Sequence, residues 1–274
     1  MGNLLLVIII IAVVILYFWA ISPRGDKNRR RICLSYAEWD YAHRGLWDME
    51  QNIPENSLPA YERAMRENEA IELDVHLTKD RQLVVIHDSN LQRLCGVDGI
   101  VEDMTYAELS QLTLCGTPYG IPLLREVLQT VHGQVPLLIE LKTLQSRDTA
   151  ICSAVYKELE FYNGTFLIES FNPYLLRWFR QHAPHILTGQ LAAGPAALPD
   201  VNPVQRVLLW LLLVHVISRP DFISYELRSA DCISVRINQF LYRTPVFVWT
   251  IRSMNEYRQG TAQYDTVIFE HFLP

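Results

Sequence analysis

Short apolar runs of β-type composition alternate with helical patterns from residue 38 to the end of the chain, and this alternation constrains the fold more than any other feature. Eight strands are expected, at Asp40–His43, Ala70–Val75, Pro136–Leu141, Thr165–Ser170, Ile186–Leu191, Phe222–Tyr225, Val246–Ile251 and Thr266–Glu270. Helices are expected between most of them, at Leu58–Glu67, Ile121–Val131, Arg147–Phe161, Tyr174–Gln181, Val204–Ile217, Asp231–Leu241 and Met254–Gln259. Eight strands that alternate with helices predict a (β/α)8 barrel, the TIM barrel. The alternative is an open doubly wound sheet, but the sequence contains no glycine-rich nucleotide-binding turn to support it.

One pair of β-type segments departs from this alternation. Leu83–His87 follows Glu72–Thr78 after a connection of only four residues. Because parallel neighbours need a crossover of a dozen or more residues, the two segments are expected to form an antiparallel hairpin. The hairpin register returns His87 to the level of Leu73 or Asp74 on the preceding strand.

The amino-terminal segment Leu4–Ile21 is an uncharged apolar run of about the length needed to cross a bilayer. No basic residue precedes it and no convincing cleavage site follows it, so a retained anchor is expected more than a cleaved signal peptide. Basic residues follow it at Arg24, Lys27, Arg29, Arg30 and Arg31. By the positive-inside rule this flank stays in the cytoplasm, which predicts a single-pass membrane protein with a cytoplasmic main domain. The alternative is that the basic residues form only a solvated linker.

Three segments are therefore expected along the chain: a transmembrane anchor at 1–23, a basic linker at 24–37 and a barrel at 38–274. The part of the barrel that follows the hairpin, 88–120, is rich in turn residues and is expected to form a small insertion at one mouth. A second apolar run, Val207–Ile217, is too short to span a membrane. It is expected either to cover the sheet as a buried helix or to enter the membrane interface beside the anchor.

The overall composition excludes some functional classes. A formal net charge of −6 is opposite to the basic surface of a general nucleic-acid-binding protein, so no nucleic-acid partner is expected. A small phosphorylated substrate is compatible with this charge because a bound metal can supply positive charge locally. The five cysteines are odd in number and include no CxxC pair, which favours reduced thiols over a disulfide framework or a zinc site.

Acidic residues share one face of two expected strands. In Ile71–Val75 the period of two places Glu72 and Asp74 on the face that points into the barrel mouth. Glu140 and Lys142 share a face in the same way at the end of a later strand. Buried carboxylates repel one another unless a cation compensates them, and hard oxygen ligands suit Mg²⁺ or Ca²⁺. The three acids therefore predict a divalent metal site, with the lysine placed to contact a phosphate oxygen.

Histidines end the first expected strand, at His43, and the hairpin, at His87. Cleavage of a phosphodiester requires a proton to leave the attacking oxygen and another to reach the leaving oxygen. A histidine pair can do both near neutral pH, so these two are the expected acid/base residues. Arg44 offers a planar fork of donors for a phosphate. Three further residues are expected to line the pocket: Glu169, Phe171 and Trp249.

The ordered motifs resemble a known family. They are His43-Arg44-Gly45, Pro54-Glu55-Asn56-Ser57, Glu72-Leu73-Asp74-Val75, Val85-Ile86-His87-Asp88, Glu140-Leu141-Lys142 and Val248-Trp249-Thr250. In this order they resemble the glycerophosphodiester phosphodiesterases, over about residues 40 to 274. No single motif is specific, whereas the ordered set is.

The resemblance implies a (β/α)8 barrel with a small insertion, which hydrolyses glycerophosphodiesters to an alcohol and sn-glycerol 3-phosphate with one divalent cation, Mg²⁺ or Ca²⁺. By position it implies that His43 and His87 are the acid/base pair. It implies metal ligands at Glu72, Asp74 and Glu140, and substrate contacts at Arg44, Lys142 and Trp249. The chain departs from the family pattern near its end, where Glu270 occupies the position of an expected aspartate and leaves the closing turn open.

Two other functions stay open at this point. The anchor and the apolar run Val207–Ile217 favour a lysophospholipase D or phospholipase-like enzyme that cleaves a membrane lipid. A catalytically inactive membrane module is the other alternative, although all five expected ligands and histidines are present. The expected partners are therefore a glycerophosphodiester or lysolipid substrate and a membrane. The headgroup, the choice of metal and the oligomeric state are not determined by the sequence.

Overall fold

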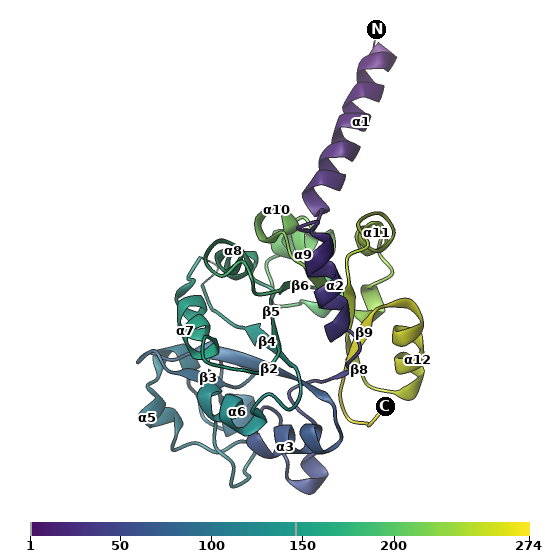
Figure 1. Ribbon diagram of the computed structural model, residues 1–274. Coiled ribbons are helices and arrows are strands. Elements are labelled where there is room, and N and C mark those ends of the chain that lie inside the picture. The colour runs from purple at the N-terminus through teal and green to yellow at the C-terminus, as the bar shows by residue number, and fades with distance from the viewer. Residues whose placement is uncertain (1, 146) are drawn as a thin grey trace.

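Eight parallel strands close into a barrel in the computed structural model, which describes residues 2–145 and 147–274 (Figure 1). The strands are β1 (Tyr41–Ala42), β2 (Ala70–Leu77), β4 (Leu137–Leu141), β5 (Phe166–Ser170), β6 (Thr188–Ala192), β7 (Phe222–Glu226), β8 (Val246–Ile251) and β9 (Thr266–Phe269). The sheet closes because β1 pairs in parallel with both β2 and β9. The predicted barrel is confirmed, and every predicted strand end lies within two residues of the observed one.

Helices surround the barrel between the strands. They are α3 (Leu58–Arg66), α6 (Leu124–Val131), α7 (Ala150–Leu159), α8 (Pro173–His182), α9 (Pro203–Trp210), α10 (His215–Ser218), α11 (Ile233–Ile237), the π-helical turn η5 (Asn238–Tyr242) and α12 (Met254–Gln263). The prediction of one continuous helix over Val204–Ile217 is wrong. Leu212 adopts a left-handed φ of 55° and is fully buried, which separates α9 from α10.

The two faces of β2 carry apolar and acidic side chains, as predicted. Ile71 and Leu73 belong to the apolar cluster between the sheet and the helices. The residues between and after them, Glu72 and Asp74, are also buried and point into the barrel. The acidic side chains of this strand therefore lie on its inner face, and the closed barrel shields them from solvent.

The predicted hairpin is confirmed by β3 (Leu83–Val85), which pairs antiparallel with the end of β2. Val75 is opposite Val85, and the amide of Ile86 donates to the carbonyl of Asp74 at 3.1 Å. The residues that follow form short helices, α4 (Gln92–Cys95), η2 (Val101–Asp103) and α5 (Tyr106–Leu109). They enclose a small apolar cluster of their own: Val84, Ile86, Leu91, Leu94, Val101, Leu109, Leu114, Ile121 and Leu123.

The segment 24–37, expected as a basic linker, contains helix α2 (Lys27–Tyr36), which begins at an Asp26 N-cap. Its buried Cys33 packs against side chains near the amino-terminal ends of the strands: Tyr41, Ala70, Leu138, Leu167, Leu187, Phe222, Phe247 and Ile268. Arg29 forms two bonds of 2.6 Å to Asp221 that fasten this helix to the barrel. Helix α2 therefore packs across the amino-terminal end of the barrel (Figure 1).

A glycine in β6 permits the tight packing at this closed end. A Cβ atom added to Gly189 would lie 2.1 Å from the ring of Phe222, which is stacked on Phe247 at 4.6 Å. We expect Gly189→Ala to destabilise the protein by about 1–3 kcal/mol because the buried rings must shift. The free energy of unfolding in urea measures this. The control is Gly120→Ala, whose new Cβ would meet only Leu112 O at 3.5 Å, and an equal effect of both substitutions would contradict the packing argument.

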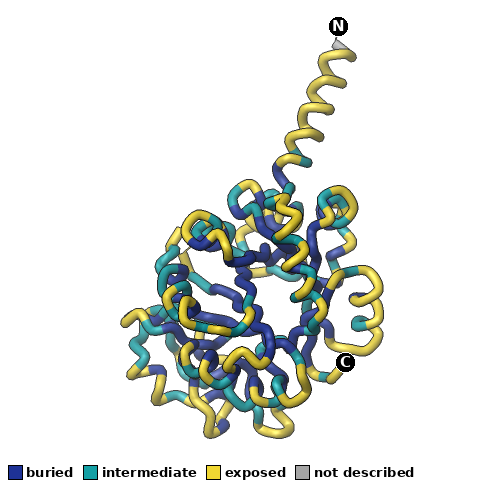
Figure 2. Tube along the Cα trace, in the orientation of Figure 1, coloured by how far each residue is buried: buried dark blue, intermediate teal, exposed yellow. Residues whose placement is uncertain are grey.

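Helix α1 (Gly2–Ile21) projects from the barrel, and most of its length is exposed (Figures 1 and 2). Within the described residues it is the one helix that is long and apolar enough to cross a membrane. Its composition agrees with the predicted apolar segment, and length and composition alone fit a membrane anchor or a signal sequence equally.

Candidate active site

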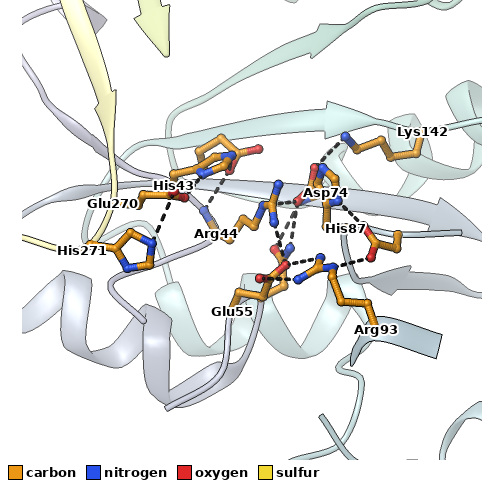
Figure 3. A network of polar contacts seen from close by, with 12 residues as sticks. His43, Arg44, Glu55, Asp74, His87, Arg93, Lys142, Glu270 and His271 are labelled. Atoms are coloured by element: carbon orange, nitrogen blue, oxygen red, sulfur yellow. Dashed lines mark hydrogen bonds and ion pairs between the residues drawn. The ribbon is translucent and has the colours of Figure 1, made fainter. Parts of the chain in front are cut away.

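A hollow of about 170 Å³ opens at the carboxyl ends of the strands, opposite the end closed by α2. Seven of the eight residues predicted from the sequence line it: His43, Arg44, Glu72, His87, Glu140, Lys142 and Trp249. The eighth, Asp74, is fully buried, and Figure 3 shows it between Arg44 and Lys142. Glu169 and Phe171 line the same hollow, as expected. The barrel therefore brings together residues that are far apart in the sequence, from β1, β2, β3, β4, β5 and β8 or the turns that follow them.

Three buried carboxylates form the floor of this hollow. Glu72, Asp74 and Glu140 each offer an oxygen, and these oxygens lie within 4.8 Å of one another. The parallel register of β2 and β4 explains this, because Asp74 is directly opposite Glu140. Burial, reinforced by the other two acids, raises the pKa of Glu72 well above its usual range. The carboxylates repel one another, and a divalent cation such as Mg²⁺ or Ca²⁺, which prefers hard oxygen ligands, would compensate their charge.

Lys142 supplies one positive charge to these acids. Its Nζ lies 2.7 Å from Glu140 and 3.0 Å from Asp74. Burial alone would raise the pKa of Asp74, but Lys142 and the other nearby cations hold it well below its usual range. Burial raises the pKa of Glu140, against the opposing effect of Lys142. Lys142 thus compensates part of the negative charge, and among the described residues it forms ion pairs with Asp74 and Glu140 but not with Glu72.

His43 is oriented by a residue from the other end of the chain. Its Nδ1 lies 2.6 Å from Glu270, which directly follows β9, and its Nε2 lies 4.0 Å from Glu72. Burial and then the charge of Arg44 lower the pKa of His43 to about 4, although Glu270 opposes this shift. Burial opposes the ionised form of Glu270, but the bond to His43 and the charge of Arg252 lower its pKa to about 2. An ionised Glu270 therefore keeps a proton on Nδ1, and Nε2 faces the acidic cluster.

His87 is held in a similar way by Asp88, whose Oδ1 lies 2.5 Å from His87 Nδ1. Burial alone would raise the pKa of Asp88, but bonds from His87 and Arg93 lower it. The backbone is fixed by His76, whose Nε2 lies 3.1 Å from the carbonyl oxygen of His87. Its Nδ1 lies 2.8 Å from Glu102 of η2. The sequence assigned His76 no role, whereas the structure shows that it connects η2 to the backbone of His87.

Arg44 lies in the turn that follows β1, where it adopts a left-handed φ of 59°. Gly45 is required next to it, because a Cβ there would lie 2.9 Å from Ala60 of α3. The amide of Arg44 donates to Glu72 at 2.9 Å, and its Nη1 donates to Glu55 at 2.7 Å. Arg93 of α4 also donates two bonds to Glu55. The Pro-Glu-Asn-Ser motif therefore orients the arginine through its glutamate.

One wall of the hollow is apolar. The rings of Phe171 and Trp249 meet edge to face, with centroids 5.8 Å apart. The Nε1 of Trp249 is buried and has no hydrogen-bond partner among the described residues. A buried indole N–H without a partner is costly, so this atom is a candidate donor to a ligand bound beside the ring.

The sequence predicted the residues that line the hollow better than those that orient them. Glu270, Asp88, His76 and Glu55 orient the histidines and Arg44. Asp88 was within reach of sequence reasoning, because it directly follows His87. The sequence marks Glu270 only as a departure from the family pattern near the chain end, with no signal that links it to His43.

The match to known proteins agrees with this geometry. Residues 43–272 match the glycerophosphoryl diester phosphodiesterase family. The chain belongs to this family. The prediction of a glycerophosphodiester phosphodiesterase is thus confirmed as an enzyme class.

Individual relatives have related names. A glycerophosphodiester phosphodiesterase of Bacillus altitudinis is 36% identical over 172 residues, which are 59% of this chain and 69% of that protein. Lysophospholipase D GDPD1 of Rattus norvegicus is 37% identical over 257 residues, with 75% of each chain covered. An Oleispira antarctica phosphodiesterase, solved in complex with the product sn-glycerol-3-phosphate, has a TM-score of 0.69 at 23% identity and covers 84% of this chain and 92% of its own. This last likeness supports the fold.

Proposed function

We propose that this family member hydrolyses water-soluble glycerophosphodiesters to an alcohol and sn-glycerol 3-phosphate with one divalent cation. The observation that carries the proposal is the acidic cluster of Glu72, Asp74 and Glu140, which faces His43 and His87 in one hollow of 170 Å³. The product bound to the Oleispira antarctica structure supports the same assignment.

The three acids would hold the cation, Mg²⁺ or Ca²⁺, since they offer converging oxygens with more negative charge than Lys142 compensates. A bound cation supplies charge neutralisation at the phosphate and activates the attacking oxygen, which is water or the glycerol hydroxyl of the substrate. Lys142 and Arg44 border the acids and present their donors to the phosphate. Trp249 and Phe171 form the apolar side against which a glycerol group packs.

The histidines would exchange the protons. In each of them Nδ1 is bonded to a carboxylate, Glu270 for His43 and Asp88 for His87, so Nε2 is the atom that accepts or donates a proton at the substrate. Two histidines with matched orientation can act as base and acid in one cleavage. An inactive module would have no need for this double arrangement.

The proposal is tested by product analysis. Purified full-length protein is incubated with glycerophosphocholine and Mg²⁺ or Ca²⁺, and phosphorus NMR identifies the phosphorylated product. We expect sn-glycerol 3-phosphate and choline. Formation of phosphocholine and glycerol, or no turnover with either cation, would contradict the proposal.

A second candidate substrate is a lysolipid, which a lysophospholipase D would cleave at the same bond. A groove of about 660 Å³ continues from Phe171 of the hollow. Much of its lining is apolar and comes from the β4 loop, the β6 loop, α9 and α10: Leu144, Leu198, Val201, Leu208, Leu209, Val214 and Ile217. Such a groove accommodates an acyl chain while the phosphate is in the hollow. The relative named lysophospholipase D GDPD1 supports this candidate.

The groove predicts a selective effect of Leu144→Gln. Leu144 is 59% exposed and lines the groove but not the hollow, so we expect kcat/KM for lysophosphatidylcholine to fall by about 10-fold with little change for glycerophosphocholine. The control is Leu273→Gln, an exposed leucine outside both cavities, for which both substrates should keep their rates. Equal losses on both substrates would exclude the groove as an acyl-chain site.

We further propose that α1 anchors the barrel to a membrane and that the barrel is cytoplasmic. The support is the apolar, exposed surface of α1 and the basic residues that follow it. In this arrangement residues 1–23 are the anchor and 38–274 the catalytic barrel, with 88–120 as its insertion. Protease digestion of sealed and opened cells tests the orientation, since a cytoplasmic barrel is cleaved only after opening.

A further inference from the structure

The carboxyl end of helix α1 packs against α10 and η5 on the outside of the barrel. An α-helix leaves its last four carbonyl groups without partners in the helix. Here the carbonyl of Ile21 accepts bonds from His215 Nδ1 at 2.9 Å and from Asn238 Nδ2 at 3.2 Å, and both side chains are fully buried. The hydroxyl of Tyr242 donates to the carbonyl of Phe18 at 2.8 Å. The barrel therefore supplies the C-terminal cap of this helix.

Arg219 adds two further contacts between the barrel and the end of α1. Its Nη1 donates to the carbonyl of Trp19 at 2.7 Å, and its guanidinium lies 4.6 Å from the centre of the Trp19 ring. Together with the buried Ile21, these contacts fix the direction of α1 relative to the barrel. Cleavage of α1 as a signal sequence would leave His215 and Asn238 without this acceptor, which favours a retained helix.

Exposed apolar side chains surround this junction. They belong to α9, α10, α11 and η5, and Figure 1 shows α9, α10 and α11 around the base of α1: Val207, Trp210, Val216, Ile233, Phe240 and Leu241. The most exposed are Phe240, at 81%, and Ile233, at 60%. We refer to these six residues as the apolar collar. Exposed apolar residues on several neighbouring elements are typical of a surface that contacts a partner or a membrane.

A basic hollow of about 350 Å³ adjoins the collar at Leu241. Its cations are Arg24, Lys27, Arg30 and Arg243. Its two carboxylates are already engaged, since Asp26 caps α2 and Asp221 binds Arg29. No ion pair joins these four cations to a carboxylate among the described residues. The hollow is therefore a site for an anionic group, such as the phosphate of a lipid.

We propose that the apolar collar and the basic hollow form a membrane seat, which lies against an anionic lipid surface. A bilayer crossed by α1 meets the collar at the same level, because the junction fixes the barrel against that helix. Apolar side chains then enter the headgroup boundary while the cations contact lipid phosphates. A second copy of the chain would cover the collar but would leave the cations unpaired. This inference rests on the proposed anchoring by α1 and is independent of the proposed hydrolysis.

The test places an environment-sensitive fluorescent amino acid at position 240 of the full-length protein in lipid nanodiscs. The matched control position is 161, where Phe161 is 84% exposed in the loop before β5 and distant in sequence from the collar. A third label at position 13 of α1 reports insertion of the helix itself. We expect lipid-borne quenchers to reduce the emission at 240 several-fold more than at 161, and more in discs rich in phosphatidylglycerol than in phosphatidylcholine.

The double variant Arg30→Glu/Arg243→Glu should remove the preference for phosphatidylglycerol while the label at 13 stays quenched. Quenching at position 13 without quenching at position 240 would contradict the membrane seat, while the proposal that α1 anchors the protein would stand. No quenching at either position would overturn the anchoring itself. Shielding at 240 that grows with protein concentration in the absence of lipid would assign the collar to a second copy and overturn the proposal.

Discussion

Replacement of either pocket histidine, as His43→Gln or His87→Gln, is expected to lower kcat for glycerophosphocholine by about 10²–10⁴-fold. Each substitution keeps a hydrogen-bonding side chain of similar reach but removes the group that transfers a proton. Because Glu270 and Asp88 bind Nδ1 of the two histidines, the lost function belongs to Nε2. Initial rates at saturating substrate and metal measure the effect.

Two further measurements separate a proton-transfer role from a structural one. A glycerophosphodiester with a p-nitrophenol leaving group needs no acid, so the variant that lacks the acid should regain much of its rate and the other should not. This comparison assigns the two roles. His182→Gln, at an exposed histidine of α8, should be fully active. Unchanged rates in both pocket variants would leave the proposed chemistry without its acid/base pair.

Replacement of one acid, as Glu72→Gln, is expected to remove the dependence of thermal stability on a divalent cation. A cation present at 100 times its Kd stabilises the native state by about 2.7 kcal/mol, which raises Tm by roughly 5–10 °C for a domain of this size. The wild type should show this shift with Mg²⁺ or Ca²⁺. The variant should not, because the cluster loses one of its three charged ligands.

The stabilities of the metal-free wild type and variant distinguish a metal ligand from a structural residue. Glu72 is buried beside Asp74 and Glu140, and this environment raises its pKa well above the usual range. In EDTA the variant should therefore be as stable as the wild type or more so, since Gln removes like-charge repulsion and its oxygen still accepts the bond from the amide of Arg44. A variant that keeps the full metal-induced shift would exclude this cluster as the cation site. A variant that is much less stable in EDTA would show that Glu72 has a structural role instead.

The sequence determined the barrel and the residues that line its mouth. The alternation of strand and helix patterns reflects local packing, because each strand is buried on both faces and each helix on one. The short connection before Leu83 left only a hairpin as a sterically possible pairing, and this placed His87 beside the acids. Strand ends that face one mouth then brought Glu72, Asp74 and Glu140 together.

Only the tertiary structure decided what orients and supports these residues. His43 and Glu270 are separated by 227 residues, and no local pattern specifies that they form a bond of 2.6 Å. The same holds for the contact of His76 with Glu102 and for the cap that His215 gives to α1. Side-chain pairs of this kind depend on how distant segments pack, whereas strand and helix patterns depend on neighbours in the chain. For this reason the sequence alone identified the lining of the pocket, and the closed barrel was needed to show how its histidines are held and how α1 is joined to it.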